Sequence, residues 1–136
     1  MMSLREFFDH YARLSLGPQP EELSSLYAAT FIVGGPAGSQ AFANDSRFID
    51  WLKQVGEFNR QHGMRSIAAI EIQERTLSPV HALATVTWGA QFSKTGERII
   101  EFEISYLLEQ AGDQWKILSY ISRSDQQEEM TKEGLL

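Results

Sequence analysis

Four tyrosines are the residues of this sequence whose chemistry and spacing best suit a binding site. Tyr11 and Tyr27 fall on the apolar sides of two N-terminal segments, and Tyr106 and Tyr120 fall in two later alternating segments. A phenol combines an apolar ring with a hydroxyl that usually finds a hydrogen-bond partner when it is buried. If these faces point inward, the hydroxyls could orient a carbonyl or hydroxyl group of a ligand. The alternative is that the tyrosines are core residues whose hydroxyls bond to the backbone.

Glu101 and Glu103 form a second candidate pair, because they stand two residues apart in an alternating segment. Paired carboxylates can divide the roles of acid and base when their environments differ. The opposite face of the same segment carries Phe102, Ile104 and Tyr106. A half-buried strand turns its apolar face to the core, so we expect the two glutamates on the outer face.

The histidines give no metal-binding pattern. His10, His62 and His81 are scattered, without His-x-His or His-Glu-x-x-His spacing, so we expect no metal and no cofactor. His62 suits the C-terminal end of a helix, where the dipole favours it. His81 stays a distant candidate base, with Glu74, if a change of register brought it inside. The glycines at 34–38 lack the Gly-Lys-Ser/Thr of a phosphate-binding loop.

Composition indicates an acidic globular protein. The 136 residues carry 12 Lys and Arg against 18 Asp and Glu, no cysteine, and 11% aromatic residues. The missing cysteine excludes disulfides and thiol chemistry. The charge of −6 argues against a nucleic-acid partner. Without a long apolar run or a signal peptide, we expect a cytoplasmic protein that enters no membrane.

The negative charge is also unevenly distributed along the chain. Residues 124–136 contain four acidic residues and one lysine, which is half of the net charge. We therefore predict one domain over residues 1–123 and an acidic C-terminal tail over 124–136, forming a short helix or a lid.

Three helices are predicted in the first half. Ser3 and Glu6 form a capping box for the first, which ends at Gly17-Pro18, and Pro20 begins a second. A short strand is expected over 30–33, followed by irregular structure over 34–38. Asn44-Asp45-Ser46 can cap a third helix that ends at Gly63. Its predicted apolar face contains Phe48, Trp51, Leu52, Val55 and Phe58.

Four long strands are predicted in the second half, where apolar residues alternate with polar ones. They cover residues 65–77, 80–92, 98–109 and 115–123, and we expect Ile70 and Ile72 on one face of the first. Short turns join them, so neighbouring strands must be antiparallel. Helices followed by a sheet define an α+β fold.

This order of elements resembles the nuclear transport factor 2-like superfamily. The resemblance covers about residues 3–123 and rests on Leu26-Tyr27-Ala28, Phe31, Gly35-Pro36 and Trp115-Lys116-Ile117. It implies a cone-shaped fold, with N-terminal helices packed in a strongly bent, mainly antiparallel sheet around an apolar pocket. It also implies a homodimer through the outer face of the sheet. An open cystatin-like sheet with less enclosure is the alternative.

Within that superfamily, ketosteroid isomerase has two tyrosines sixteen residues apart, and Tyr11 and Tyr27 keep that spacing. The position that matches its catalytic Asp is Gly35, and its second Asp matches Ile104. Neither side chain can take up a proton. The resemblance therefore implies the fold but not the isomerase mechanism.

These observations predict a pocket for a small apolar ligand that bears a carbonyl or hydroxyl group. Catalysis, if there is any, would be cofactor-free isomerisation, cyclisation or dehydration, as the resemblance implies. The alternative is a non-catalytic dimerisation or partner-binding module whose cavity is filled by its own side chains. The residues predicted to line the pocket are Tyr11, Tyr27, Trp51, Trp88, Phe102, Tyr106 and Tyr120.

Overall fold

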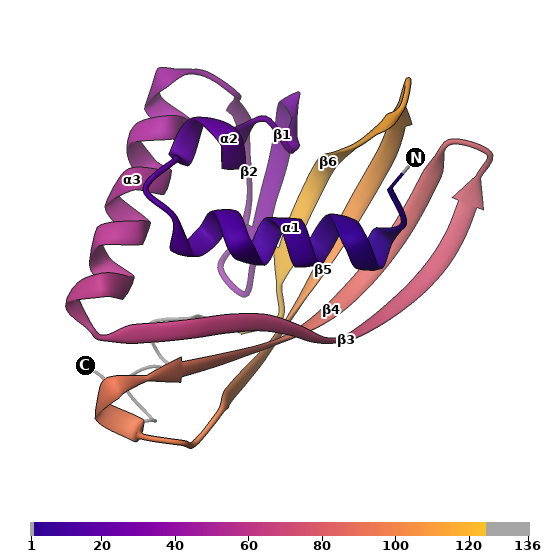
Figure 1. The fold of residues 1–136 in the computed structure, drawn as a ribbon. Coiled ribbons are helices and arrows are strands. Elements are labelled where there is room, and N and C mark those ends of the chain that lie inside the picture. The colour runs from indigo at the N-terminus through magenta and orange to yellow at the C-terminus, as the bar shows by residue number, and fades with distance from the viewer. Residues whose placement is uncertain (1, 125–136) are drawn as a thin grey trace.

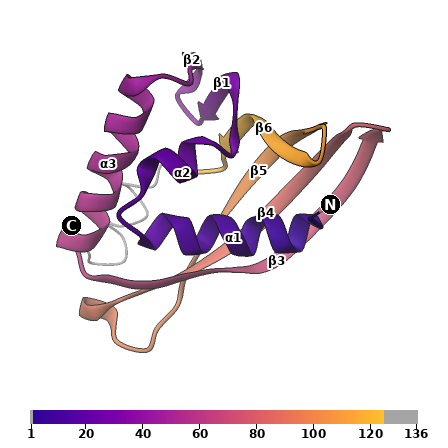
Figure 2. The ribbon, with the colours of Figure 1, turned by 45° about the horizontal axis from the view of Figure 1, so that its top comes forward.

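The computed structural model describes residues 2–124, which form three α-helices packed on one curled, six-stranded sheet. The helices α1 (Leu4–Leu16), α2 (Pro20–Ser24) and α3 (Ser46–Gln61) lie on the same side of the sheet (Figures 1 and 2). The strands are β1 (Tyr27–Gly35), β2 (Gly38–Ala43), β3 (Met64–Ser78), β4 (His81–Phe92), β5 (Ile100–Ala111) and β6 (Gln114–Ser122). Their order is β2-β1-β6-β5-β4-β3, and only the β1–β6 pair is parallel among these strands.

The start of α1 is fixed by the predicted capping box. The Ser3 hydroxyl accepts a hydrogen bond from the Glu6 amide at 3.1 Å, and the Glu6 carboxylate accepts one from the Ser3 amide at 3.1 Å. These two bonds satisfy amide groups that the first helical turn leaves without partners. The apolar face that follows buries Leu4, Phe7, Phe8 and Ala12 against the sheet.

The alternation in β4 and β5 sets the core, as predicted. Ala84, Val86 and Trp88 of β4 are almost completely buried, as are Tyr106 and Leu108 of β5. Tyr106 lies opposite Ala84, and Phe102 lies opposite Trp88. Phe8 of α1 contacts the rings of both Trp88 and Tyr106, so α1 packs directly on the concave face of the sheet.

Strand β2 was not predicted, because its region was expected to be irregular. Gly35 pairs with Gly38 across a two-residue turn, Pro36-Ala37, and the chain returns as β2 along β1. Proline at the second position of a turn is typical, and Gly38 takes a φ of +124°, which glycine adopts without strain. The segment lacks the β-branched residues that usually indicate a strand.

A bulge corrects the predicted face of β3. The register with β4 shifts between Ala69 and Glu71, so Ala69 and Ile72 both face the core. The residue at the bulge, Ile70, turns outward and is 47% exposed. Strict alternation therefore placed Ile70 and Ile72 on one face wrongly, because a bulge adds one residue to one strand.

Helix α3 also differs from its predicted packing. Asp45 caps it through the Arg47 amide at 3.0 Å. Phe48 is its only buried residue among those described, and Trp51 is 49% exposed. The predicted apolar face of α3 is therefore only partly covered, and Trp51 stays about half exposed although it was expected on that face. Leu52, Val55 and Phe58 stay half-buried.

The predicted tail, residues 124–136, lies outside the described residues apart from Ser124. Its expected helix or lid, and the boundary at residue 123, therefore stay predictions. No described helix is long and apolar enough to cross a membrane.

Candidate phenol site on the concave face

The candidate site is a cluster of three phenols and one indole between α1 and the sheet. Helix α1 contributes Tyr11, β1 contributes Tyr27, β4 contributes Trp88 and β5 contributes Tyr106. Their rings are in contact: the Tyr11 centroid lies 6.2 Å from Tyr27, 5.6 Å from Trp88 and 6.1 Å from Tyr106. Residues far apart in the sequence thus meet at one point.

Hydrogen bonds and ring contacts join these four side chains into one network. The Tyr11 and Tyr27 hydroxyls lie 2.5 Å apart, and the Trp88 indole N–H donates to the Tyr106 hydroxyl at 3.0 Å. Ring contacts of Tyr11 with Trp88 and Tyr106 connect these two hydrogen-bonded pairs. Tyr27 and Tyr106 are buried, whereas Tyr11 is partly buried. Tyr11 is therefore the least enclosed of the three phenols.

The electrostatics of the network keep the phenols protonated. Burial raises the pKa of Tyr11 to about 12, although interactions with the Tyr27 and Tyr106 hydroxyls lower it in part. Burial raises the pKa of Tyr27 and of Tyr106 well above the usual value as well. At neutral pH each phenol is thus a hydrogen-bond donor.

Either hydroxyl can be the donor in the Tyr11–Tyr27 hydrogen bond. A phenol has one O–H donor and two acceptor lone pairs, so the pair keeps one O–H that can donate to a third group. When Tyr27 donates to the Tyr11 oxygen, that O–H is the one of Tyr11.

Half-buried apolar side chains lie around this network on the same face of the sheet. Tyr120 lies opposite Tyr106, and Val33 lies opposite Tyr120. Ile67 and Phe102 are half-buried and pack against the same core, and Leu52 of α3 does so from the helical side. The phenol network thus has an apolar, partly exposed border.

The structure brings together five of the seven predicted pocket residues by ring contact. Tyr11, Tyr27, Trp88, Tyr106 and Tyr120 form the cluster, in which the Tyr106 and Tyr120 centroids lie 5.6 Å apart. The sixth, Phe102, packs on the same core. The seventh, Trp51, stacks on Phe48 and shares no ring contact with the cluster among the described residues. Their role in ligand binding stays a prediction.

The other candidate groups lie away from the cluster. On the outer face, Glu101 is exposed and Glu103 pairs with Arg123 at 2.7 Å, as expected. His81 faces Glu109 at 3.2 Å and Ser78 at 2.7 Å, so no register change brings it inside. His62 caps α3, and its Nδ1 lies 2.8 Å from the Phe58 carbonyl oxygen. The described residues contain no group of three or more potential metal ligands of the His, Cys, Asp and Glu types.

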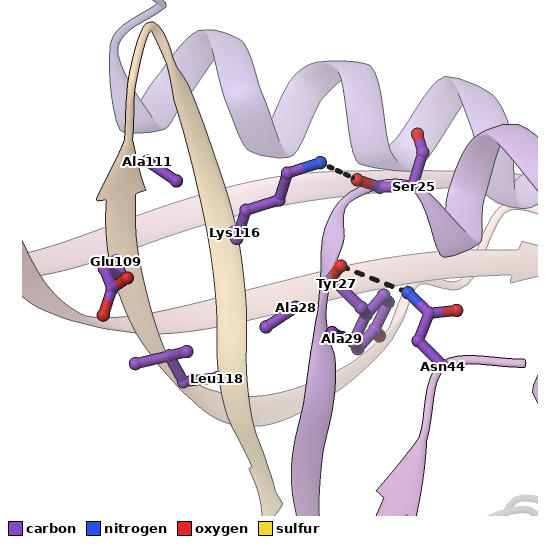
Figure 3. Close-up of a pocket in the computed structure, with 9 residues that line it drawn as sticks. All are labelled: Ser25, Tyr27, Ala28, Ala29, Asn44, Glu109, Ala111, Lys116 and Leu118. Carbon is purple, nitrogen blue, oxygen red and sulfur yellow. Dashed lines mark hydrogen bonds between the residues drawn. The ribbon is translucent and has the colours of Figure 1, made fainter.

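An open pocket of about 420 Å³ lies between the start of β1 and the β5–β6 hairpin (Figure 3). The Lys116 ammonium in its wall donates to the Ser25 carbonyl oxygen at 2.5 Å. The side-chain amide of Asn44 donates to the Tyr27 carbonyl oxygen at 3.2 Å. These polar residues were not among the predicted site residues. The Glu109–Lys116 pairing could have been read from the predicted hairpin, but the position of Asn44 depends on the unpredicted strand β2.

This arrangement of helices on a curled mixed sheet defines the class of fold, a cone-shaped α+β fold. The chain belongs to a family described as NTF2-like protein (DUF6841), whose model matches residues 3–125. The resemblance to nuclear transport factor 2-like proteins is thereby confirmed. No protein of curated function matches the sequence.

Solved structures share the same fold at low sequence identity. An NTF2-like protein with a cystatin-like fold from Novosphingobium aromaticivorans is 12% identical, with a TM-score of 0.71 over 89% of this chain and 79% of its own. A protein provisionally assigned as a scytalone dehydratase, from the same organism, is 18% identical, with a TM-score of 0.60 over 85% and 77%. One provisionally assigned as a ketosteroid isomerase, from Parabacteroides distasonis, is 13% identical, with a TM-score of 0.55 over 90% and 89%.

Proposed function

We propose that this protein binds a small apolar molecule through a carbonyl or hydroxyl oxygen that accepts a hydrogen bond from Tyr11. The observation that carries the proposal is the Tyr11–Tyr27 hydroxyl pair, which lies among half-buried apolar side chains. When Tyr27 donates to the Tyr11 oxygen, the Tyr11 O–H can donate to a ligand. A few polar groups among apolar side chains are typical of small-molecule sites.

The apolar border supports the same class of ligand. Ile67, Phe102 and Leu52 are half-buried, so a bound apolar molecule would remove further apolar surface from water. The ligand would rest on these side chains and place its oxygen at Tyr11. The names of two structural neighbours, a dehydratase and an isomerase, agree with a small-molecule ligand.

Binding is supported better than catalysis. The matches to the isomerase acids are Gly35 and the buried Ile104, and neither can act as a base. Among the described residues, no carboxylate or histidine forms a hydrogen bond with Tyr11, Tyr27 or Tyr106. If the protein catalyses a reaction, Tyr11 would stabilise negative charge on the substrate oxygen, in a cofactor-free isomerisation, cyclisation or dehydration.

Replacing Tyr11 by phenylalanine should weaken binding of an apolar ketone by about 2- to 13-fold, because one hydrogen bond contributes about 0.5–1.5 kcal/mol. The probes are a steroid enone and its deoxygenated analogue, titrated by calorimetry into wild-type protein and Tyr11→Phe. The analogue should bind both proteins equally. Equal loss for both probes would mean that the substitution disturbs packing, and no loss for the ketone would remove Tyr11 from the site.

The outer face of the sheet supports a second proposal, a homodimer. At Gly89 of β4, a Cβ atom would lie 2.3 Å from Ile70 Cδ1 and 2.9 Å from Ile99 Cγ2. The two isoleucines therefore lean over the glycine, and both are about half exposed. Adjacent exposed apolar residues on a sheet face are a feature of protein–protein interfaces.

Ile70→Lys should shift the sedimentation equilibrium of the outer-face dimer toward smaller species by at least tenfold in Kd, because burying an unpaired charge in an apolar interface is unfavourable. Leu77→Lys, at a residue of β3 that is also half exposed, is the matched control for adding a charge. An unchanged mass for Ile70→Lys would contradict an interface at this position.

A further inference from the structure

The two edges of the sheet differ in how they are protected. Edge strand β3 carries Arg65, Glu71, Glu74 and Arg75, and three shifts interrupt its register with β4. Charges and bulges of this kind prevent an edge from pairing with another strand. Edge strand β2 has the sequence Gly-Ser-Gln-Ala-Phe-Ala, without any charge, and all six of its residues are exposed.

The hydrogen-bond pattern shows which backbone groups of β2 face outward. The backbone N–H of Asn44 donates to the Ala29 carbonyl oxygen at 2.9 Å, so Asn44 and Ala29 form a hydrogen-bonded pair between β2 and β1. Bonded and non-bonded pairs alternate in an antiparallel ladder. The amides and carbonyls of Ser39, Ala41 and Ala43 therefore point away from β1. In the described part of the chain, one of these groups already has a partner: the Ala43 carbonyl oxygen accepts a hydrogen bond from the backbone N–H of Asp45 at 3.0 Å.

We propose that β2 pairs antiparallel with β2 of a second copy of this chain, around a two-fold axis at Ala41. Ala41 would then exchange two backbone hydrogen bonds with Ala41 of the partner subunit. Ser39 would lie opposite the partner's Ala43, and Phe42 would lie opposite the partner's Gln40. The pairing extends the sheet across two subunits through groups that are now exposed.

The charge pattern favours a second copy over an unrelated peptide. In a two-fold contact the stretch of strand around the axis lies against its own copy, so a charge at or next to Ala41 would lie close to a like charge. No ionisable residue occurs from Pro36 to Asn44. An uncharged strand fits its own copy without repulsion and has no charge with which to select a foreign peptide.

The side chains also permit close approach. Ser39, Ala41 and Ala43 are small and lie on one face, and Phe42 is 38% exposed on the other. Pairing would cover Phe42, whose ring stacks on the buried Phe31 at 6.0 Å. This edge is distinct from the outer face around Ile70, so both contacts can form in one assembly.

Ala41→Pro and Ala41→Lys test the edge by sedimentation equilibrium, and Ala41→Ser is the matched control. Proline removes the outward amide without breaking the ladder to β1, and lysine places like charges at the axis. Both should weaken edge association at least tenfold, whereas serine should leave it within twofold. The measurements are repeated with Ile70→Lys, so that loss of the outer-face dimer is recognised separately.

A measurement on the wild-type chain avoids any dependence on folding of the variants. Amide hydrogen exchange is followed from about 1 µM to about 1 mM protein. The Ala41 amide should exchange at least tenfold more slowly at the higher concentration, while the inward Phe42 amide should not change. Equal exchange of Ala41 at both concentrations, or full association of both Ala41→Pro and Ala41→Lys, would overturn the proposal.

Discussion

Trp88→Ala is expected to lower the free energy of unfolding by about 3–5 kcal/mol, the usual cost of removing a large buried aromatic side chain. Trp88 is 2% exposed and contacts the rings of Phe8 and Tyr11. Its indole N–H also donates a hydrogen bond to the Tyr106 hydroxyl. The substitution therefore leaves a cavity and removes a buried hydrogen bond, and both effects have the same sign.

Urea unfolding at neutral pH measures this change, and Trp51→Ala is the matched control. Trp51 is the same residue type but is 49% exposed, so its loss should change the free energy by about 0.5 kcal/mol or less. Similar losses for both variants would contradict the position of Trp88 at the centre of the core.

Raising the pH above 10 is expected to destabilise the protein steeply. In the unfolded chain a tyrosine loses its proton near pH 10, whereas burial raises the pKa of Tyr11 to about 12 and those of Tyr27 and Tyr106 well above the usual value. The folded state then binds more protons than the unfolded state, so stability falls as the pH rises. The stability that the three protonated phenols contribute is fully present below about pH 10, and the part that Tyr11 contributes is lost by about pH 12.

Three phenols that stay protonated only in the folded state give a slope of about 4 kcal/mol per pH unit, at about 1.4 kcal/mol for each. Urea unfolding between pH 9 and pH 11.5 measures the slope. Because other groups also titrate there, the test is the difference between wild-type protein and Tyr27→Phe, which should be one proton. An equal slope in both would show that Tyr27 is not buried as a neutral phenol.

The sequence predicts the elements that depend on local patterns. The capping box at Ser3 and the alternation around Trp88 and Tyr106 each specify a burial pattern without reference to distant residues. The structure differs from the prediction where an extra residue shifts the register of a strand, or where tertiary packing determines how much of a helix face is buried. The bulge at Ile70 reverses one face of β3, and Trp51 stays half exposed although it belongs to the predicted apolar face of α3.

The candidate site shows the same difference between local patterns, which can be predicted, and long-range contacts, which cannot. The residue types and the spacing of Tyr11 and Tyr27 indicate that their rings could meet, and they do. The hydrogen bond from Trp88 to Tyr106 cannot be predicted from spacing, because it joins two different strands. Strand β2, and with it the exposed edge, was missed because its alanines and glycine carry no periodic signal.

The central claim, that Tyr11 donates a hydrogen bond to a ligand oxygen on the concave face, is tested most directly by a crystal structure with the steroid enone bound. We expect the ketone oxygen about 2.5–3.0 Å from the Tyr11 hydroxyl oxygen, with the rings of the ligand against Phe102 and Ile67. An enone found instead in the pocket lined by Lys116 and Asn44, or a concave face that stays empty at saturating enone, would contradict it.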